Sequence, residues 1–133
     1  MSFDWVDLLR LAEALESAPD SPGPPEAALR SAVSRAYYAA FHCALNLASK
    51  EGFVPSYSGD DHQKVQAHFR NSSPSDSNHR KIAVELGRLY RNRCAADYDD
   101  TLRSQPGSLA SLSINMARSV LCKLNSIPNS QRE

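Results

Sequence analysis

The sequence predicts an all-α fold. Alanine, leucine, arginine and serine dominate its 133 residues, and apolar residues recur at the spacing of helix turns. No segment shows the apolar–polar alternation that is typical of a strand. A chain of this length suits one domain with one hydrophobic core. We therefore expect a single domain over residues 1–133, built from four main helices and one shorter helix.

A proline-rich segment separates the first two predicted helices. The first helix is predicted over about residues 3–17, because apolar residues at helical spacing form one face: Trp5, Leu8, Leu9, Ala12 and Leu15. Residues 18–24 ("APDSPGP") are predicted to form a loop, since proline disrupts a helix interior. The second helix is predicted over about 25–51. Pro24 and Pro25 suit its start, and Gly52 suits its end.

Three further helices follow in the second half of the chain. Asp60 and Gln63 have the spacing of a capping box, which predicts a short helix to about Arg70. Residues 71–78 ("NSSPSDSN") are predicted to be a polar turn. The fourth helix is predicted over about 79–97 or slightly beyond, and the last over about 108–127. Residues 128–133 are predicted to be a frayed tail.

The second predicted helix has two different faces. Its apolar face is rich in alanine, which lets neighbouring helices approach closely: Leu29, Val33, Ala36, Tyr37, Ala40, Ala44, Leu47 and Ala48. A polar stripe lies within an arc of about 80° on the other side: Ser31, Arg35, Tyr38, His42, Asn46 and Ser49. This stripe has no lysine and no acid, unlike most solvated helix faces. Either it is an exposed rim with a chance histidine, or it contacts a partner subunit or a phosphate-bearing ligand.

Charge continues the apolar face of the fourth predicted helix. Ile82, Leu86 and Leu89 form that face, and Arg93 and Asp97 extend it at a spacing that allows them to pair. Burying a charge is costly unless it is paired and hydrogen-bonded. Two interpretations remain open: the helix end emerges into solvent, or the pair forms a preorganised polar site at the mouth of the bundle.

A different face of the same helix carries Arg91, Ala95 and Tyr98 together with Val84 and Gly87. Glycine inside a helix costs about 1 kcal/mol relative to alanine. We therefore expect Gly87 to allow a close helix approach, for which a second subunit is one candidate.

Composition narrows the function classes. Fifteen basic and fifteen acidic residues balance, which argues against a bulk electrostatic grip on nucleic acid. Cys43, Cys94 and Cys122 show no C-x-x-C spacing and lie beside apolar residues, so buried free thiols in a reducing cytosol are expected. There is no signal-peptide pattern and no run of 18 apolar residues, which predicts a cytoplasmic protein without membrane association.

The histidines do not predict a metal site. The spacings of His42, His62, His68 and His79 match no usual zinc pattern, and no cysteine pair supports them. We expect neither a metal nor a cofactor. His62 falls in the first turn of its predicted helix, where a surface or interface role is expected.

Three segments in this order resemble the HEPN superfamily, and in particular its small single-domain bacterial and archaeal members: "SAVSRAYYAAFHCALNLA", "DHQKVQAHF" and "LGRLYRNRCAADYDD". The resemblance spans about residues 3–125. It implies a four- to five-helix up-and-down bundle that is usually a homodimer. Active HEPN proteins are metal-independent ribonucleases, in which an arginine and a histidine four to six residues later meet in the dimer cleft.

This sequence departs from that motif at the histidine. In the toxin–antitoxin class of HEPN proteins, the motif is Arg, four residues, His, one residue, Tyr. Arg91 and Tyr98 match its ends, but Ala96 occupies the histidine position. In that class a nucleotidyltransferase partner adds AMP to the tyrosine, so the resemblance implies Tyr98 as a modification site and a nucleotidyltransferase-like antitoxin as a partner.

The candidate site residues follow from the motif and the polar stripe. The candidates for catalysis are Arg91, Arg93, Asp97 and His42, with His42 as the substitute for the missing histidine. The candidates for contacting RNA or a nucleotide are Arg35, Tyr38 and Asn92. In such a site the histidine would transfer protons and an arginine would stabilise the phosphate.

Three functions remain in competition at this point. The chain is a HEPN ribonuclease or toxin component, a non-catalytic HEPN module that binds a nucleotide or a nucleotidyltransferase-like partner, or a helical interaction protein. We favour a HEPN module in a toxin–antitoxin or defence setting and leave its ribonuclease activity open.

Overall fold

A computed structural model describes residues 2–17, 25–72 and 77–127. It confirms the all-α prediction, since the described residues form five helices and no strand: α1 (Val6–Ser17), α2 (Pro25–Lys50), α3 (Asp61–Arg70), α4 (Ser77–Tyr98) and α5 (Pro106–Ser126). The predicted loop over 18–24 and the predicted tail over 128–133 lie outside the described residues.

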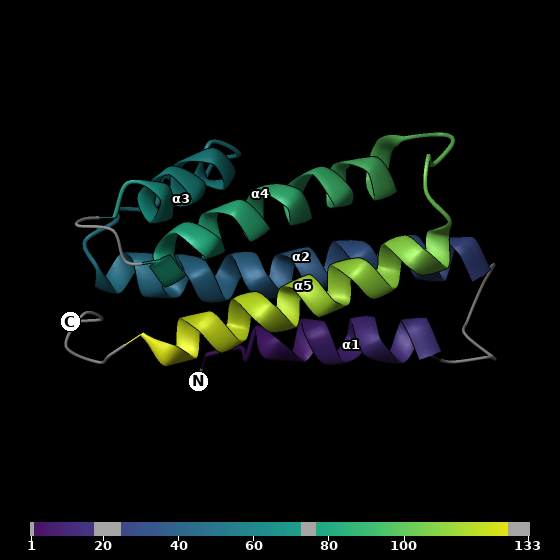
Figure 1. Cartoon of the computed structure of the whole chain (residues 1–133), viewed down its shortest axis with the longest axis horizontal. Helices are drawn as coiled ribbons and strands as arrows, with labels where there is room; N and C mark the ends of the chain where they lie inside the picture. The colour runs from purple at the N-terminus through teal and green to yellow at the C-terminus, as the bar shows by residue number, and fades with distance from the viewer. Residues whose placement is uncertain (1, 18–24, 73–76, 128–133) are drawn as a thin grey trace.

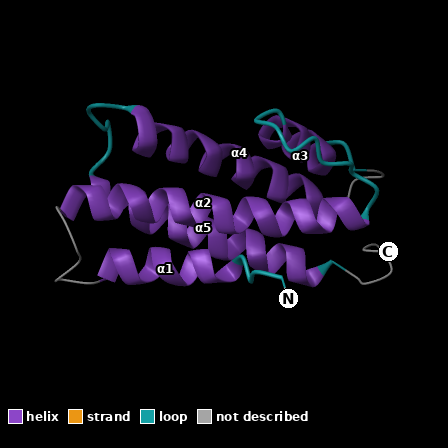
Figure 2. Cartoon of the chain, turned by 180° about the vertical axis from the view of Figure 1, so that it is seen from behind, coloured by secondary structure: helices purple, strands orange, loops and turns teal. Residues whose placement is uncertain are grey.

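The helices form a bundle around α2. Figure 1 shows α1, α2, α4 and α5 running in alternating directions along the long axis, while the short α3 lies beside the first half of α4. Figure 2 shows the same arrangement from behind, with α2 between α1 and α4. Helix α2 contacts each of the other four helices, which makes it the centre of the fold.

The central position of α2 explains its alanine content. The predicted apolar face is buried except for Leu29, which is half-buried, and burial extends well beyond that face. Six alanines of α2 are fully buried: Ala32, Ala36, Ala39, Ala40, Ala44 and Ala48. Side chains of this size leave room for neighbouring helices on several sides at once. The predicted polar stripe is exposed at its two ends, and its middle residues are half-buried: Arg35, Tyr38 and His42.

The helix ends agree with the sequence in one case and differ in another. Gly52 has a φ of +103°, as expected for a glycine that follows a helix. The predicted capping box at Asp60 and Gln63 is wrong, because Asp60 is helical and makes no side-chain cap. Instead, the buried Asp61 accepts hydrogen bonds from the backbone N–H groups of Ser56 and Tyr57 and from the Ser56 hydroxyl. This carboxylate fixes the loop that leads into α3.

The carboxylate that directly follows the C-terminus of α2 contacts side chains of both α3 and α4. Glu51 lies 2.9 Å from Nε2 of His68 on α3 and 2.9 Å from Nε2 of His79 on α4. These contacts assign the two histidines to the packing of α3. In the part of the chain that the structure describes, no group of histidine, cysteine and acidic residues could hold a metal ion.

The cysteines and the helix lengths complete the comparison. All three cysteines are free, but the prediction that they are buried is wrong: Cys43 and Cys94 are half-buried and Cys122 is exposed. Within the described ranges, no helix combines the length and the apolar character that a membrane span requires.

Candidate functional site

Arg93 lies inside the bundle and not at a wet helix end. Only 6% of its surface is exposed. Its guanidinium carbon lies 5.3–5.9 Å from the ring centres of four tyrosines, two on α2 and two on α4: Tyr37, Tyr38, Tyr90 and Tyr98. Aromatic faces stabilise a cation at such distances. Of the two interpretations left open by the sequence, emergence into solvent is wrong for Arg93 but holds for Asp97, which is exposed.

A polar chain links Arg93 to the α2 stripe. Arg93 Nη1 lies 3.5 Å from Asp97 Oδ2, as the spacing predicted. The Ser34 hydroxyl donates to Asp97 at 3.4 Å, and Arg35 donates to the Ser34 oxygen at 3.3 Å. Arg35 also lies over the Tyr38 ring at 5.6 Å. Arg93 therefore contacts the Asp97 carboxylate directly, and Arg35 is linked to it through Ser34.

The end of α4 is held in place by α2. Arg30 donates to the backbone carbonyls of Ala96 at 3.1 Å and Asp99 at 2.6 Å. Carbonyls at a helix C-terminus have no partner within the helix, and a cationic side chain there supplies one. Arg30 thus fixes the last turn of α4, which carries Asp97 and Tyr98.

An open cavity of about 420 Å³ adjoins this chain of contacts. Its lining comes from α1, α2 and α4: Leu11, Leu15, Ser31, Ser34, Arg35 and Asp97. We call it the Arg35 pocket. It combines one cation, one carboxylate and two hydroxyls with two leucines, so it offers a small molecule more polar contacts than most ligand pockets do.

The histidine nearest to Arg93 is His62 and not His42. His62 Nδ1 is hydrogen-bonded to the Tyr37 hydroxyl, and its ring also packs against Phe41 and Tyr90. The His42 ring instead stacks on the ring of Trp5, which directly precedes α1, with 3.6 Å between the ring centres. The sequence predicts only a surface or interface role for His62, because it falls in the first turn of its helix, and does not predict the contact with Tyr37, which is 25 residues away. Its one available signal was that α3 had to pack somewhere on α2.

Burial and neighbouring charges shift the pKa values of His62, His42 and Arg93. Burial and the positive charge of Arg93 lower the pKa of His62, while Asp61 opposes the shift. Burial, followed by the charge of His62, lowers the pKa of His42. Burial acts to lower the pKa of Arg93, but Tyr38, Cys94, Tyr98 and Asp97 outweigh it and leave that pKa raised. Arg93 is therefore a permanent cation beside neutral histidines.

These histidines predict a loss of stability in mild acid. Below their ordinary pKa of 6.5, the unfolded chain protonates His42 and His62, whereas the folded chain leaves them neutral down to their lowered pKa values. The unfolded state then binds more protons, so the free energy of unfolding falls as pH falls through this window. Thermal melts between pH 7 and pH 5 test this. The double variant His42→Phe, His62→Gln should show a shallower pH dependence than wild type, and equal slopes would contradict the assignment.

Three predicted site residues fall in different places. Arg91 is exposed and faces α3, on the side of α4 that carries Gly87. Asn92 donates to Ser113 on α5 at 3.2 Å. The structure therefore separates both residues from Arg93. Tyr98, which was expected on the Arg91 face, leans over Arg93 with 74% of its surface exposed.

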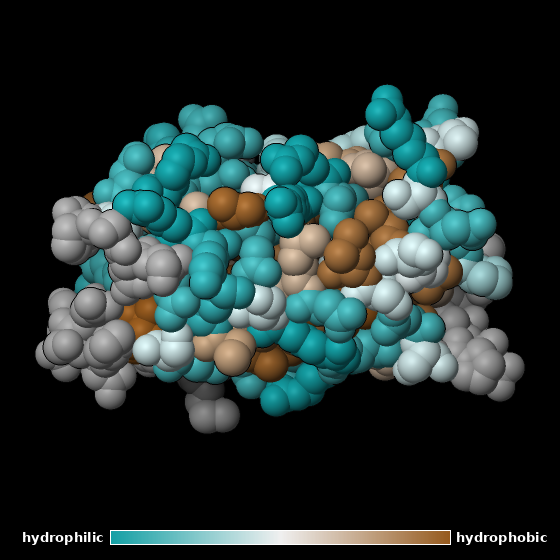
Figure 3. All heavy atoms as spheres, viewed as in Figure 1, coloured by the Kyte–Doolittle hydropathy of each residue, from teal (hydrophilic) through white to brown (hydrophobic). Residues whose placement is uncertain are grey.

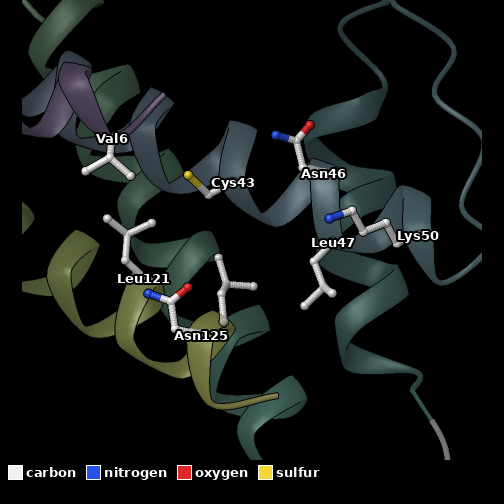
Figure 4. A pocket seen from close by; sticks show the side chains of 8 residues that line it. Val6, Cys43, Asn46, Leu47, Lys50, Leu121 and Asn125 are labelled. Carbon is white, nitrogen blue, oxygen red and sulfur yellow. The ribbon is translucent and has the colours of Figure 1, made fainter. Parts of the chain in front are cut away.

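A second cavity carries no such constellation. Figure 4 shows it between the start of α1 and the ends of α2 and α5, where Val6, Leu47 and Leu121 surround Cys43. Burial raises the pKa of the Cys43 thiol to about 11. Since the thiolate is the nucleophile, this cysteine is not activated, and we assign the cavity no chemistry.

Comparison with protein-family models, curated proteins and solved structures found no match to this chain.

Proposed function

We propose that this chain is a HEPN-like helical module that binds a nucleotide in the Arg35 pocket. The observation that carries the proposal is that residues from three separate segments meet in one cluster. The three segments behind the family resemblance are far apart in sequence, yet Tyr37, His62 and Arg93, one from each segment, belong to a single cluster. That cluster adjoins the Arg35 pocket through Asp97.

The lining of the pocket favours a nucleotide over a bare anion. The Arg35 guanidinium can hold a phosphate through two parallel hydrogen bonds. Asp97 repels a ligand made only of phosphates, but its carboxylate accepts hydrogen bonds from ribose hydroxyls or base amino groups. The exposed Tyr98 ring and the half-buried Tyr38 ring offer surfaces for base stacking.

AMP binding tests this role. We expect AMP to raise the melting temperature of the wild-type protein, because a ligand that binds only the folded state stabilises it. Arg35→Gln should weaken AMP binding by about tenfold or more, which corresponds to 1.4 kcal/mol or above. Arg103→Gln is the matched control, since Arg103 is exposed in the loop after α4 and lies outside the lining of the pocket. The nucleotide role is wrong if AMP does not bind wild type, or if both variants bind AMP equally well.

The resemblance also supports a toxin–antitoxin or defence setting, with a homodimer and a nucleotidyltransferase-like partner. Tyr98 has the exposure that transfer of AMP to its hydroxyl requires. Mass spectrometry after co-expression with such a partner tests the transfer: unmodified Tyr98 would exclude it for that partner.

Ribonuclease activity is the second candidate function. It is favoured by the neutral His62 near the fixed cation of Arg93, since this pair supplies proton transfer and charge stabilisation without a metal. It is disfavoured at the motif itself, because Ala96 is 97% buried and Arg91 faces elsewhere. RNA incubated with wild type, His62→Gln and Arg91→Gln in the presence of EDTA separates these ideas. Cleavage that requires His62 but not Arg91 would support His62 and Arg93 as the pair that replaces the arginine and histidine of the family motif.

A further inference from the structure

A groove between α3 and α4 carries a concentrated positive charge that the proposed function does not use. It has a volume of about 390 Å³, and seven residues line it: Gln66, Arg70, Arg80, Ala83, Val84, Gly87 and Arg91. Three of these residues are arginines and none is acidic. The whole chain has a net charge of zero, so this local excess is not a consequence of composition. Figure 3 shows hydrophilic side chains over α3 and the first half of α4.

The three arginines have no partners among the described residues. Arg70, Arg80 and Arg91 are exposed, and none of them makes an ion pair or a side-chain hydrogen bond in the described parts of the chain. Elsewhere on the surface Arg10, Arg30 and Arg118 each pair with a carboxylate, whereas the exposed Arg88 and Arg103 are unpaired among the described residues but stand apart from the groove lining. The guanidinium groups of the groove are thus available to an anion.

An unpartnered donor in the wall of the groove is the second, independent observation. Gln66 is 93% buried, and its amide nitrogen Nε2 has no hydrogen-bond partner in the described structure. Leaving a buried donor unpaired costs about 1–3 kcal/mol. Gln66 lines the groove but Nε2 itself is covered in the structure, so a phosphate oxygen accepts from this amide once the Gln66 side chain turns towards the groove.

Gly87 keeps this wall of the groove open. A Cβ atom at this position would lie 3.2 Å from Gln66 Oε1 and 3.7 Å from Arg91 Nη1. The absence of a side chain lets α3 approach α4 closely, with Gln66 Oε1 and Arg91 Nη1 both beside Gly87. The close approach that the sequence predicted at Gly87 is real, and α3 of the same chain provides it.

The spacing of the arginines indicates an elongated ligand. Eleven residues separate Arg80 from Arg91 on α4, which corresponds to about 16 Å along the helix axis. A single sulfate-sized anion covers only part of this length, whereas a chain of phosphates can contact the groove at several points.

We propose that this groove is a second binding site, specific for a linear chain of phosphate groups. The phosphate chain of a nucleoside triphosphate and a free polyphosphate share this chemistry. The proposal does not depend on the Arg35 pocket, because the two sites have no residue in common.

Inorganic tripolyphosphate is the probe, and its effect on the melting temperature is the measurement. We expect it to stabilise wild type and the charge-matched control Arg88→Gln plus Arg103→Gln, whose two arginines are exposed outside the groove, more than it stabilises Arg80→Gln plus Arg91→Gln. Affinity for the last variant should fall by at least tenfold. These arginines are exposed, so the variants should fold. Equal stabilisation of the three proteins, or no stabilisation of wild type, would overturn the site.

Gln66→Met separates binding from folding. It preserves the length of the side chain and removes the unpaired donor, so the unliganded protein should be at least as stable as wild type while its tripolyphosphate affinity falls. Unchanged tripolyphosphate affinity would overturn the proposed contact between Gln66 and the phosphate chain. ATP and a short single-stranded RNA distinguish the sources. Similar affinities for ATP and tripolyphosphate support recognition of the phosphate chain alone, whereas binding of RNA or ATP without binding of tripolyphosphate would overturn it.

Discussion

Phe69→Ala should destabilise the protein by about 3–5 kcal/mol, the usual cost of truncating a buried phenylalanine. Phe69 is fully buried, and its ring lies 5.4 Å from that of His79 on α4. Helix α3 has only ten residues, and isolated helices of that length are marginal in water. Its stability therefore comes from the few side chains that it buries, of which Phe69 and Val65 are fully buried.

Urea denaturation of wild type, Phe69→Ala and Val54→Ala measures this effect. Val54 is 82% exposed, so its truncation should change the free energy of unfolding by less than about 0.5 kcal/mol. Hydrogen exchange should locate the loss for Phe69→Ala in α3 first. A cost below about 1 kcal/mol for Phe69→Ala would mean that α3 is held by its loops and not by its core contacts.

The sequence predicted the helices well because their signals are local. Apolar spacing, proline and the glycine at position 52 act within a few residues, and they located all five helices to within a few positions. The capping box at Asp60 failed because a neighbouring acid, Asp61, forms stronger contacts with the loop before it. Where two acids are adjacent, tertiary structure decides which of them makes the contacts at the start of the helix.

The site was predictable only where one helix carried the whole pattern. Arg93 and Asp97 lie four residues apart, so their pairing could be read from periodicity, although only Arg93 turns inward while Asp97 is exposed. His62 could not be found in this way, because its partner Tyr37 is 25 residues away and the angle between α3 and α2 is not encoded in either helix alone. The role of Arg30 was hidden for the same reason, since it caps a helix 66 residues further on.

Arg93 is the residue at which stability and function can be separated. Arg93→Ala should destabilise the fold by about 2–4 kcal/mol, because it removes a long buried side chain from contact with four tyrosine rings. Arg93→Met preserves most of that volume and removes both the charge and the buried Nε, which has no hydrogen-bond partner in the described structure. Replacing a buried charge by an apolar side chain of similar size is often neutral or stabilising.

We therefore expect the free energy of unfolding of Arg93→Met, measured in urea, to lie within about 1.5 kcal/mol of the wild-type value. That of Arg93→Ala should be much lower. The same two proteins then report on function. Without the cation, Asp97 loses its charged partner at 3.5 Å and keeps only the Ser34 hydroxyl at 3.4 Å, so its carboxylate is held less firmly beside the Arg35 pocket. AMP affinity should then fall in a protein whose fold is intact. A well-folded Arg93→Met with wild-type AMP affinity would limit Arg93 to a structural role, whereas a severe loss of stability in both variants would mean that the tyrosine cluster needs the positive charge itself.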